Sequence, residues 1–250
     1  MKTIIFLFTT VLFFGCTKNE QPINPQQIPQ DTIPDNDFPE EATFDLDASA
    51  VPKFVRFNYI EKDSIMKVSM FRSGIGHDYS DDFESCRSMK HYFMPRGTDW
   101  SAIKIYSPVD GTVISRFDEW AGSQLHIRSK EYPAFTFRIF HVKADPSIVV
   151  GSELTAGQAI GTHISNETMS DIAVAVKTPA DGPKDHSSIE KGLRLISFFQ
   201  VMTDSLFNTY GTGSRNNFII DENSRNNDPI ECNGEAFSSS GTLENWVTLP

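Results

Sequence analysis

The sequence contains little cysteine, few basic residues and no hydrophobic run long enough to cross a bilayer. Its three cysteines in 250 residues are too few for a disulfide scaffold, so a hydrophobic core must supply most of the stability. Lysine and arginine number 22 against 33 aspartate and glutamate residues, which gives a formal net charge of −11. An acidic chain lacks the basic surface that binds phosphate backbones, so we expect no nucleic-acid partner.

Several motifs of other enzyme classes are also absent from the sequence. There is no Gly-x-Ser-x-Gly nucleophile elbow, no glycine-rich phosphate loop and no Cys-x-x-Cys pair. The composition is that of a folded protein, with 39% hydrophobic and 22% charged residues. It excludes a polytopic membrane protein and a wholly disordered chain.

The longest apolar run lies at the N-terminus and ends at a cysteine. Residues 4–15 make a run of about 12 residues, short of the roughly 20 that span a bilayer as a helix, so we interpret residues 1–15 as a signal peptide. The sequence Leu-Phe-Phe-Gly before Cys16 resembles the lipidation box of bacterial lipoproteins. That resemblance implies a lipid on Cys16, membrane attachment through it, and a location in the bacterial cell envelope, periplasmic or at the cell surface. The alternative is a secretory peptide cut elsewhere, with Cys16 discarded or paired.

The next segment, residues 16–45, has the composition of a tether. It holds five prolines, many polar and acidic residues and scarcely any apolar residue that could offset the entropy of ordering. If Cys16 carries lipid, Cys86 and Cys232 remain, and an extracytoplasmic compartment allows them to form a disulfide. Such a bond would staple the C-terminal tail to the main domain. The alternative is two separate buried thiols.

Short alternating apolar runs predict a mainly β domain over residues 46–180. The expected strands share a two-residue period and are separated by turn residues, and they cover residues 53–60, 65–71, 102–109, 111–117, 123–129, 134–142, 158–164 and 171–176. An antiparallel sandwich or barrel is the packing that such strands favour. Near-helical spacing predicts one C-terminal helix over 189–210, and the region 181–250 is expected to pack on the β-domain through this helix and a polar tail.

The order of these segments resembles a known peptidase family. The segments with this resemblance read SPVDGTV, GSQLHIRS, FRIFHV, VVGSELTAGQAIGTH and SDIAVAV, all between residues 107 and 176. Together they resemble the lysostaphin-type (LytM-like) zinc endopeptidases, which cut peptidoglycan and whose β-core is called a duplicated hybrid motif. Their turns also occur in carrier domains and hybrid barrels, so these segments imply a fold before they imply a chemistry.

The resemblance implies a zinc ion with an open coordination position, which acidifies bound water. His77 and Asp81 have the spacing of the family's His-x-x-x-Asp ligand pair, without its usual glycine, and a second register over residues 72–76 offers arginine and glycine instead. His141 matches a catalytic strand histidine that stabilises the oxyanion or orients water. The final His-x-His motif reads Asp171-Ile172-Ala173, and alanine can neither bind zinc nor transfer a proton.

The missing His-x-His motif separates three functional hypotheses. The first is an envelope lipoprotein with a non-catalytic peptidase-like domain, which binds or scaffolds at peptidoglycan or a partner protein through a groove near His77, Asp81 and His141. The second is an active zinc endopeptidase with rearranged ligands, such as His77, Asp81 and His163. The third is a glycan-binding surface lipoprotein that uses exposed aromatic residues, of which the candidates are Trp100, Trp120 and Tyr132.

Overall fold

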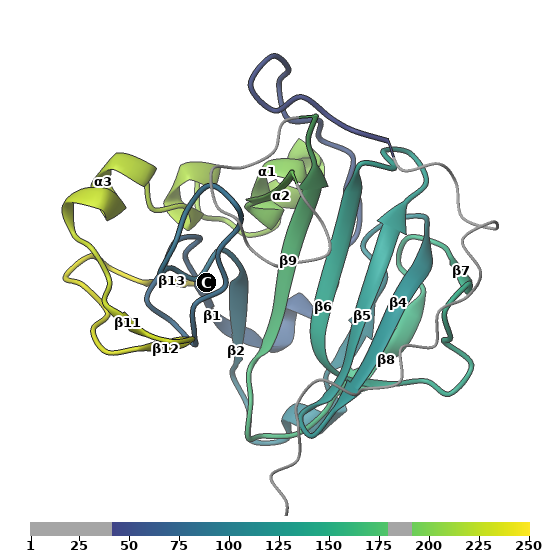
Figure 1. The fold of residues 1–250 in the computed structure, drawn as a ribbon. Coiled ribbons are helices and arrows are strands. Elements are labelled where there is room, and N and C mark those ends of the chain that lie inside the picture. Colours follow the sequence, from purple (N-terminus) through teal and green to yellow (C-terminus); the bar gives the residue numbers. More distant parts are fainter. Residues whose placement is uncertain (1–41, 180–191) are drawn as a thin grey trace, which may run out of the picture. The chain divides into compact units, whose positions relative to one another are not determined.

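Antiparallel strands make up most of the fold (Figure 1). The computed structural model describes residues 42–179 and 192–250; the predicted signal peptide 1–15, Cys16, the tether up to residue 41 and the predicted boundary at 180 lie outside the described residues. The strands are β1 (Ile65–Ser69), β2 (His91–Pro95), β3 (Lys104–Tyr106), β4 (Gly111–Glu119), β5 (Gly122–Ser129), β6 (Phe135–Ala144), β7 (Glu153–Leu154), β8 (Ala159–His163), β9 (Ser170–Lys177), β10 (Leu193–Ile196), β11 (Cys232–Asn233), β12 (Ala236–Phe237) and β13 (Trp246–Thr248).

The helices are short and lie toward the C-terminus. They are α1 (Phe198–Val201), α2 (Asp204–Asn208) and α3 (Glu222–Asn227), with 3-10 turns at Lys62–Ser64, Trp100–Ala102 and Arg215–Phe218. Within the described residues, no helix is long and apolar enough to cross a membrane.

One open sheet contains all strands except the small hairpin β11–β12. Its order is β13-β1-β2-β9-β6-β5-β4-β7, and every strand pair is antiparallel. β10 pairs with the second half of β9, past the residues of β9 that pair with β2. β8 pairs with both β6 and β3. The described part of the chain confirms the predicted mainly β, antiparallel class, as a sandwich-like fold without a closed barrel.

β9 is buried on both of its faces, which explains its nearly continuous apolar sequence. Ile172, Val174 and Val176 point into the main core, whereas Ala173 and Ala175 point into a second, smaller cluster. The buried side chains of that second cluster are Phe71, Met89, Phe140, Ala173, Ala175 and Leu195. The second face of β9 is therefore covered by the chain's own segments rather than by solvent.

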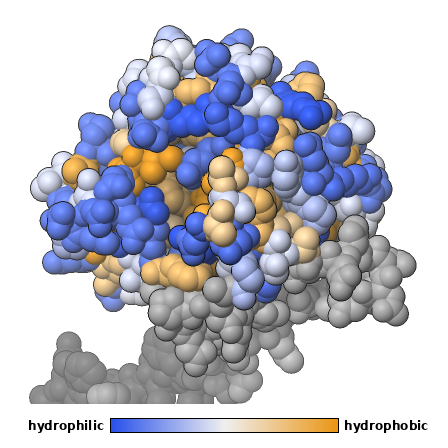
Figure 2. All heavy atoms as spheres, turned by 90° about the horizontal axis from the view of Figure 1, so that it is seen from above, coloured by the Kyte–Doolittle hydropathy of each residue, from blue (hydrophilic) through white to orange (hydrophobic). Residues whose placement is uncertain are grey.

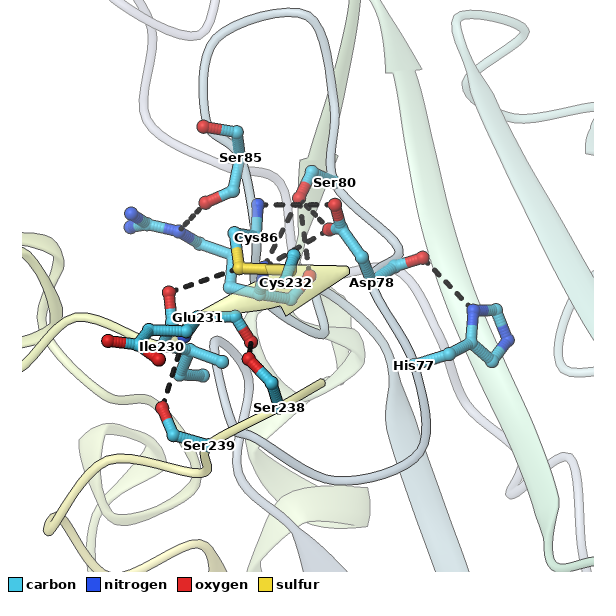
Figure 3. The surroundings of a disulfide bond; sticks show 11 residues. His77, Asp78, Ser80, Ser85, Cys86, Ile230, Glu231, Cys232, Ser238 and Ser239 are labelled. Carbon is cyan, nitrogen blue, oxygen red and sulfur yellow. Dashed lines mark hydrogen bonds between the residues drawn. A yellow bond between two sulfur atoms is a disulfide. The ribbon is translucent and has the colours of Figure 1, made fainter. Parts of the chain in front are cut away.

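The cover over this face comes from the loop between β1 and β2 and from the C-terminal tail. A disulfide between Cys86 and Cys232 joins the two, with Cα atoms 5.7 Å apart, and Figure 3 shows this bond beside the loop residues His77 to Cys86. Backbone bridges add to it, from His77 to Ala236 and from the Asp78 N–H to the Glu235 carbonyl. The predicted disulfide is thus present in the structure, and the polar tail is ordered by packing and by this bond.

The region 189–210 differs from the single helix that its spacing predicts. Leu193–Ile196 is the strand β10, because its backbone completes the ladder of β9. Ser197 then caps α1 in a capping box with Gln200, and Thr203 caps α2 after an extended residue at Met202. Residues 189–191 lie outside the described residues. Over Leu193–Ile196 the helical prediction is wrong for the backbone, since pairing to a neighbouring strand cannot be read from local periodicity.

Two other strand predictions also differ from the structure. Residues 53–60 form isolated bridges at Val55 and Ile60 and no regular strand. β2 was not predicted, although it lies between β1 and β9 in the sheet. Its alternation is obscured because Tyr92 and Phe93 are both buried, one on each face of the strand.

His91 is a structural histidine at the start of β2. Its Nδ1 lies 2.7 Å from the Ser69 carbonyl and its Nε2 lies 2.8 Å from the Ser197 hydroxyl, so the ring joins β1, β2 and the cap of α1. Burial lowers the pKa of His91 to about 4, because a charged imidazole would lose its hydration. The neutral ring donates to the carbonyl through one nitrogen and accepts from the hydroxyl with the other.

This neutral ring makes the stability depend on pH. The unfolded chain binds a proton at His91 below pH 6.5 and the folded chain only near pH 4, so the contribution is complete above pH 6.5 and is lost as the pH falls toward 4. In His91→Asn, urea unfolding between pH 6 and pH 4.5 should show a slope of stability against pH that is shallower by about 1.4 kcal/mol per pH unit. Parallel slopes in the parent and the variant would contradict the assignment.

Candidate functional site

A buried ion pair lies at the centre of the face that carries the predicted site. Lys90 directly precedes β2, and Asp171 is the second residue of β9. The Lys90 Nζ lies 2.5 Å from Asp171 Oδ2, and the two side chains are 1% and 0% exposed. Because Tyr92 is paired with Asp171 across the two strands, the two-residue period places Lys90 on the same face.

Aromatic rings surround the ammonium group. Lys90 Nζ lies 4.2 Å from the ring centroid of Phe140, 4.8 Å from that of Tyr79 and 5.0 Å from that of Tyr92. The Tyr79 ring is held in turn by the Arg138 guanidinium, which donates to its hydroxyl over 3.1 Å. Ring faces stabilise a cation that has lost its water, so the rings offset part of the cost of burial.

The electrostatics keep Lys90 charged in the folded protein. Burial acts to lower the pKa of Lys90, but the Asp171 carboxylate, with smaller contributions from Tyr92 and Tyr79, outweighs it and leaves that pKa above its ordinary value. Burial also raises the pKa of Tyr92 to about 12, so this ring stays protonated beside the pair. The folded protein therefore keeps a lysine ammonium buried beside a tyrosine that retains its proton.

His141 approaches the pair from a bulge in β6. Phe140 and His141 both lie opposite the single residue Gln124 of β5, and His141 has a positive φ of 61°. Its Nε2 lies 3.3 Å from Asp171 Oδ1, its Nδ1 lies 3.2 Å from the Ala121 carbonyl, and its side chain is 20% exposed. The predicted catalytic histidine thus contacts the carboxylate and keeps one edge in solvent.

His77 contacts the lysine of the same pair. Its Nε2 lies 3.3 Å from Lys90 Nζ, and its Nδ1 lies 3.0 Å from the Asp78 carbonyl. An ammonium can only donate, so Nε2 accepts from Lys90 and Nδ1 carries the proton that it donates to the carbonyl. The lone pair with which His77 could bind a metal is already engaged by a cation.

Asp81 takes part in a separate network. Its Oδ1 accepts the N–H groups of Phe83 and Glu84, and its Oδ2 accepts that of Leu195, each over 2.9 Å. Burial raises its pKa, and the hydrogen bonds oppose that shift. These contacts order the loop and attach it to β10, as expected of an aspartate that satisfies backbone donors.

These positions give a poor fit to zinc. Within residues 42–179 and 192–250, no three His, Cys, Asp or Glu side chains gather in a way that could hold a metal ion. His163, the alternative ligand, is fully buried beside Trp100, and burial with the nearby His141 lowers its pKa to about 4. Ala173 lies in the second apolar cluster. The donor atoms that a zinc ion requires meet a lysine ammonium instead.

Lys90 is the functional residue that sequence reasoning missed. The available signal was a lysine between Met89 and the aromatic segment Tyr92-Phe93, because lysine is almost never fully buried unless it is paired. The partner could not be identified, since Asp171 lies 81 residues further along the chain.

The predicted aromatic residues do not form one exposed groove. Trp100 and Tyr132 are partly buried against the main core. Trp120 is 83% exposed at the tip of the β4–β5 hairpin, and the next residue, Ala121, offers its carbonyl to His141. Figure 2 shows another part of the surface, where hydrophilic residues surround a smaller apolar group. Trp120 is thus the aromatic candidate for contact with a ligand, because it lies next to Ala121, which contacts the partly exposed His141.

Comparison with known proteins adds two similar structures. No protein-family model matches the chain, and no curated protein matches it in sequence. A chain of the SpoIIQ–SpoIIIAH pore-forming complex is similar, with 10% identity and a TM-score of 0.35 over 52% of this chain and 85% of that chain. The solution structure of lysostaphin is similar, with 11% identity and a TM-score of 0.29 over 44% of this chain and 49% of lysostaphin. Both TM-scores are below 0.5, so the family likeness remains a resemblance of motifs.

Replacing Lys90 by methionine should destabilise the fold strongly. The substitution keeps the length and leaves the Asp171 carboxylate buried without its cation, which costs about 3–5 kcal/mol. Lys130→Met is the matched control, because Lys130 pairs with Glu153 where both side chains are more than half exposed, and it should cost less than about 1 kcal/mol. Urea unfolding measures both, and equal losses would contradict the central role of the buried pair.

Proposed function

We propose that this chain is a bacterial envelope lipoprotein whose β-domain is a non-catalytic relative of the lysostaphin-type peptidases, and that it binds peptidoglycan. The Lys90 ammonium carries this proposal. It engages the donor atoms of Asp171 and His77 within a sealed aromatic shell, where the family chemistry requires a metal with an open position.

The location is part of the same proposal. The lipidation box at Cys16 and the polar tether place the domain outside the cytoplasm, held to a membrane by its N-terminal lipid. The disulfide between Cys86 and Cys232 supports this location, because such bonds persist in oxidising compartments.

The contact surface is the open edge at His141 and Trp120. His77 and Asp81 belong to the loop that covers β9, where His77 is half-buried and pairs with the tail at Ala236 and Asp81 is buried against β10, so the protein itself occupies the groove expected there. An exposed indole next to a partly exposed histidine offers a flat apolar face and a polar edge, which suits a polymer of amino sugars and short peptides. A partner protein at this edge is the alternative occupant.

Metal analysis separates the binding protein from an active peptidase. The soluble form, residues 17–250, purified without chelator and then incubated with zinc, should hold far less than one zinc ion per chain, because His77 accepts from an ammonium. It should also release no fragments from purified peptidoglycan. About one zinc per chain, lost in both His77→Ala and His141→Ala, would establish a rearranged zinc hydrolase instead.

Cosedimentation with purified peptidoglycan tests the binding surface. Trp120→Ala should weaken binding by roughly fivefold, about 1 kcal/mol, because the indole is the large exposed contact of this edge. Val149→Ala is the control, since Val149 is also exposed, at 53%, but lies away from the hairpin tip in the sequence. Equal affinities of both variants and the parent would exclude this surface, and no sedimentation of the parent would favour a protein partner.

A further inference from the structure

The contact between Lys90 and Asp171 is closer than an ordinary ion pair requires. Nζ lies 2.5 Å from Oδ2, whereas N⁺–H···O⁻ contacts usually measure about 2.7–2.9 Å. Within the described residues, neither carboxylate oxygen of Asp171 has a hydrogen bond of normal geometry. The amine nitrogen and the carboxyl group are therefore pressed together outside the alignment that a hydrogen bond would give them.

The surroundings keep water away from these two groups. Both side chains are sealed from solvent, and the rings of Tyr79, Tyr92 and Phe140 surround the nitrogen. Transfer of one proton from the ammonium to the carboxylate, which gives the neutral amine that attack requires, is less disfavoured in such a medium than in water, and an amide, once formed, is protected from hydrolysis. The strand ladder of β2 and β9 holds the reacting atoms in place, which removes the entropic cost of bringing them together.

We propose that Lys90 and Asp171 join in the folded protein through an intramolecular isopeptide bond. This modification would cross-link β2 to β9 directly. It does not depend on the proposed peptidoglycan binding, and it leaves the Lys90 nitrogen between Asp171 and His77, as an amide N–H in place of the ammonium. It would stand four residues from Cys86, so the loop that covers β9 would be fixed by two covalent links, one to the sheet and one to the C-terminal tail.

The reaction needs no other reactant. One proton passes from the Lys90 ammonium to the Asp171 carboxylate, the neutral nitrogen then attacks Cγ of Asp171, a C–N bond forms, and one C–O bond breaks. The ammonium begins with three protons; two of them leave with the departing carboxylate oxygen as water, and one remains as the amide N–H. His77 Nε2 lies 3.3 Å from Nζ and His141 Nε2 lies 3.3 Å from Oδ1, so an imidazole nitrogen stands beside each of the two atoms between which protons move.

Peptide mapping of the full chain tests this bond directly, because it reports on the peptides that contain Lys90 and Asp171. After denaturation, reduction and digestion with trypsin, we expect Lys90 to resist cleavage and its peptide to be joined to the peptide that contains Asp171, with loss of one water. Cleavage after Lys90, together with an unlinked Asp171 peptide of full mass, would overturn the proposal. The parent protein alone decides the matter, so the result does not depend on the folding of any variant.

Mass differences between intact proteins provide a second measurement. The parent should be lighter, relative to Lys90→Arg, by the substitution difference plus one water, because arginine keeps the charge but cannot form this amide. Lys130→Arg is the matched control, since Lys130 pairs with an exposed glutamate, and it should differ from the parent by the substitution alone. A Lys90→Arg difference equal to that of the control, or a water loss that maps to another residue pair, would exclude the bond.

Discussion

The interaction between Lys90 and Asp171 determines what the rest of this face can be. A lysine and an aspartate without solvent access are costly unless each satisfies the other, so the strands that carry them must hold a fixed register. The aromatic rings of Tyr79 and Phe140 pack over the ammonium, His77 accepts from the ammonium, and His141 lies against the carboxylate. Ordering of the loop before β2 follows from these contacts.

The covering of β9 follows from the same constraint. A carboxylate at this position of an exposed sheet face would be hydrated, and its lysine would be free to move. Here the loop of residues 70–90 and the C-terminal tail exclude water, and the disulfide between Cys86 and Cys232 holds the two covering segments together. Asp81 contributes by attaching the loop to β10 through the Leu195 N–H. The C-terminal region thus completes the domain, although its polar sequence has little periodicity of its own.

Sequence patterns predicted the sheet well because strands such as β5 and β6 have a period of two and are bounded by turn residues. The disulfide could be predicted from the number of cysteines that remain after Cys16. The patterns failed where the fold depends on distant pairing: Leu193–Ile196 became a strand because β9 offered an open edge, and β2 was missed because both faces are buried.

The site was predicted only in part. His77 and His141 do reach one cluster, but spacing from a known motif could not reveal that a lysine lies between them and that Asp81 does not.

A cation supplied by a side chain has different functional consequences from a bound metal. A zinc ion can keep a coordination position open for water. The Lys90 ammonium fills the space among its partners and has no such position. The Lys90 ammonium holds Asp171 in place, and Asp171 in turn contacts His141, whose exposed edge lies beside the β4–β5 hairpin. The buried pair therefore makes this part of the surface rigid without leaving a coordination position open. A rigid surface of this kind suits the recognition proposed above, with the contact at the exposed edge of His141 and Trp120 rather than among the buried charges.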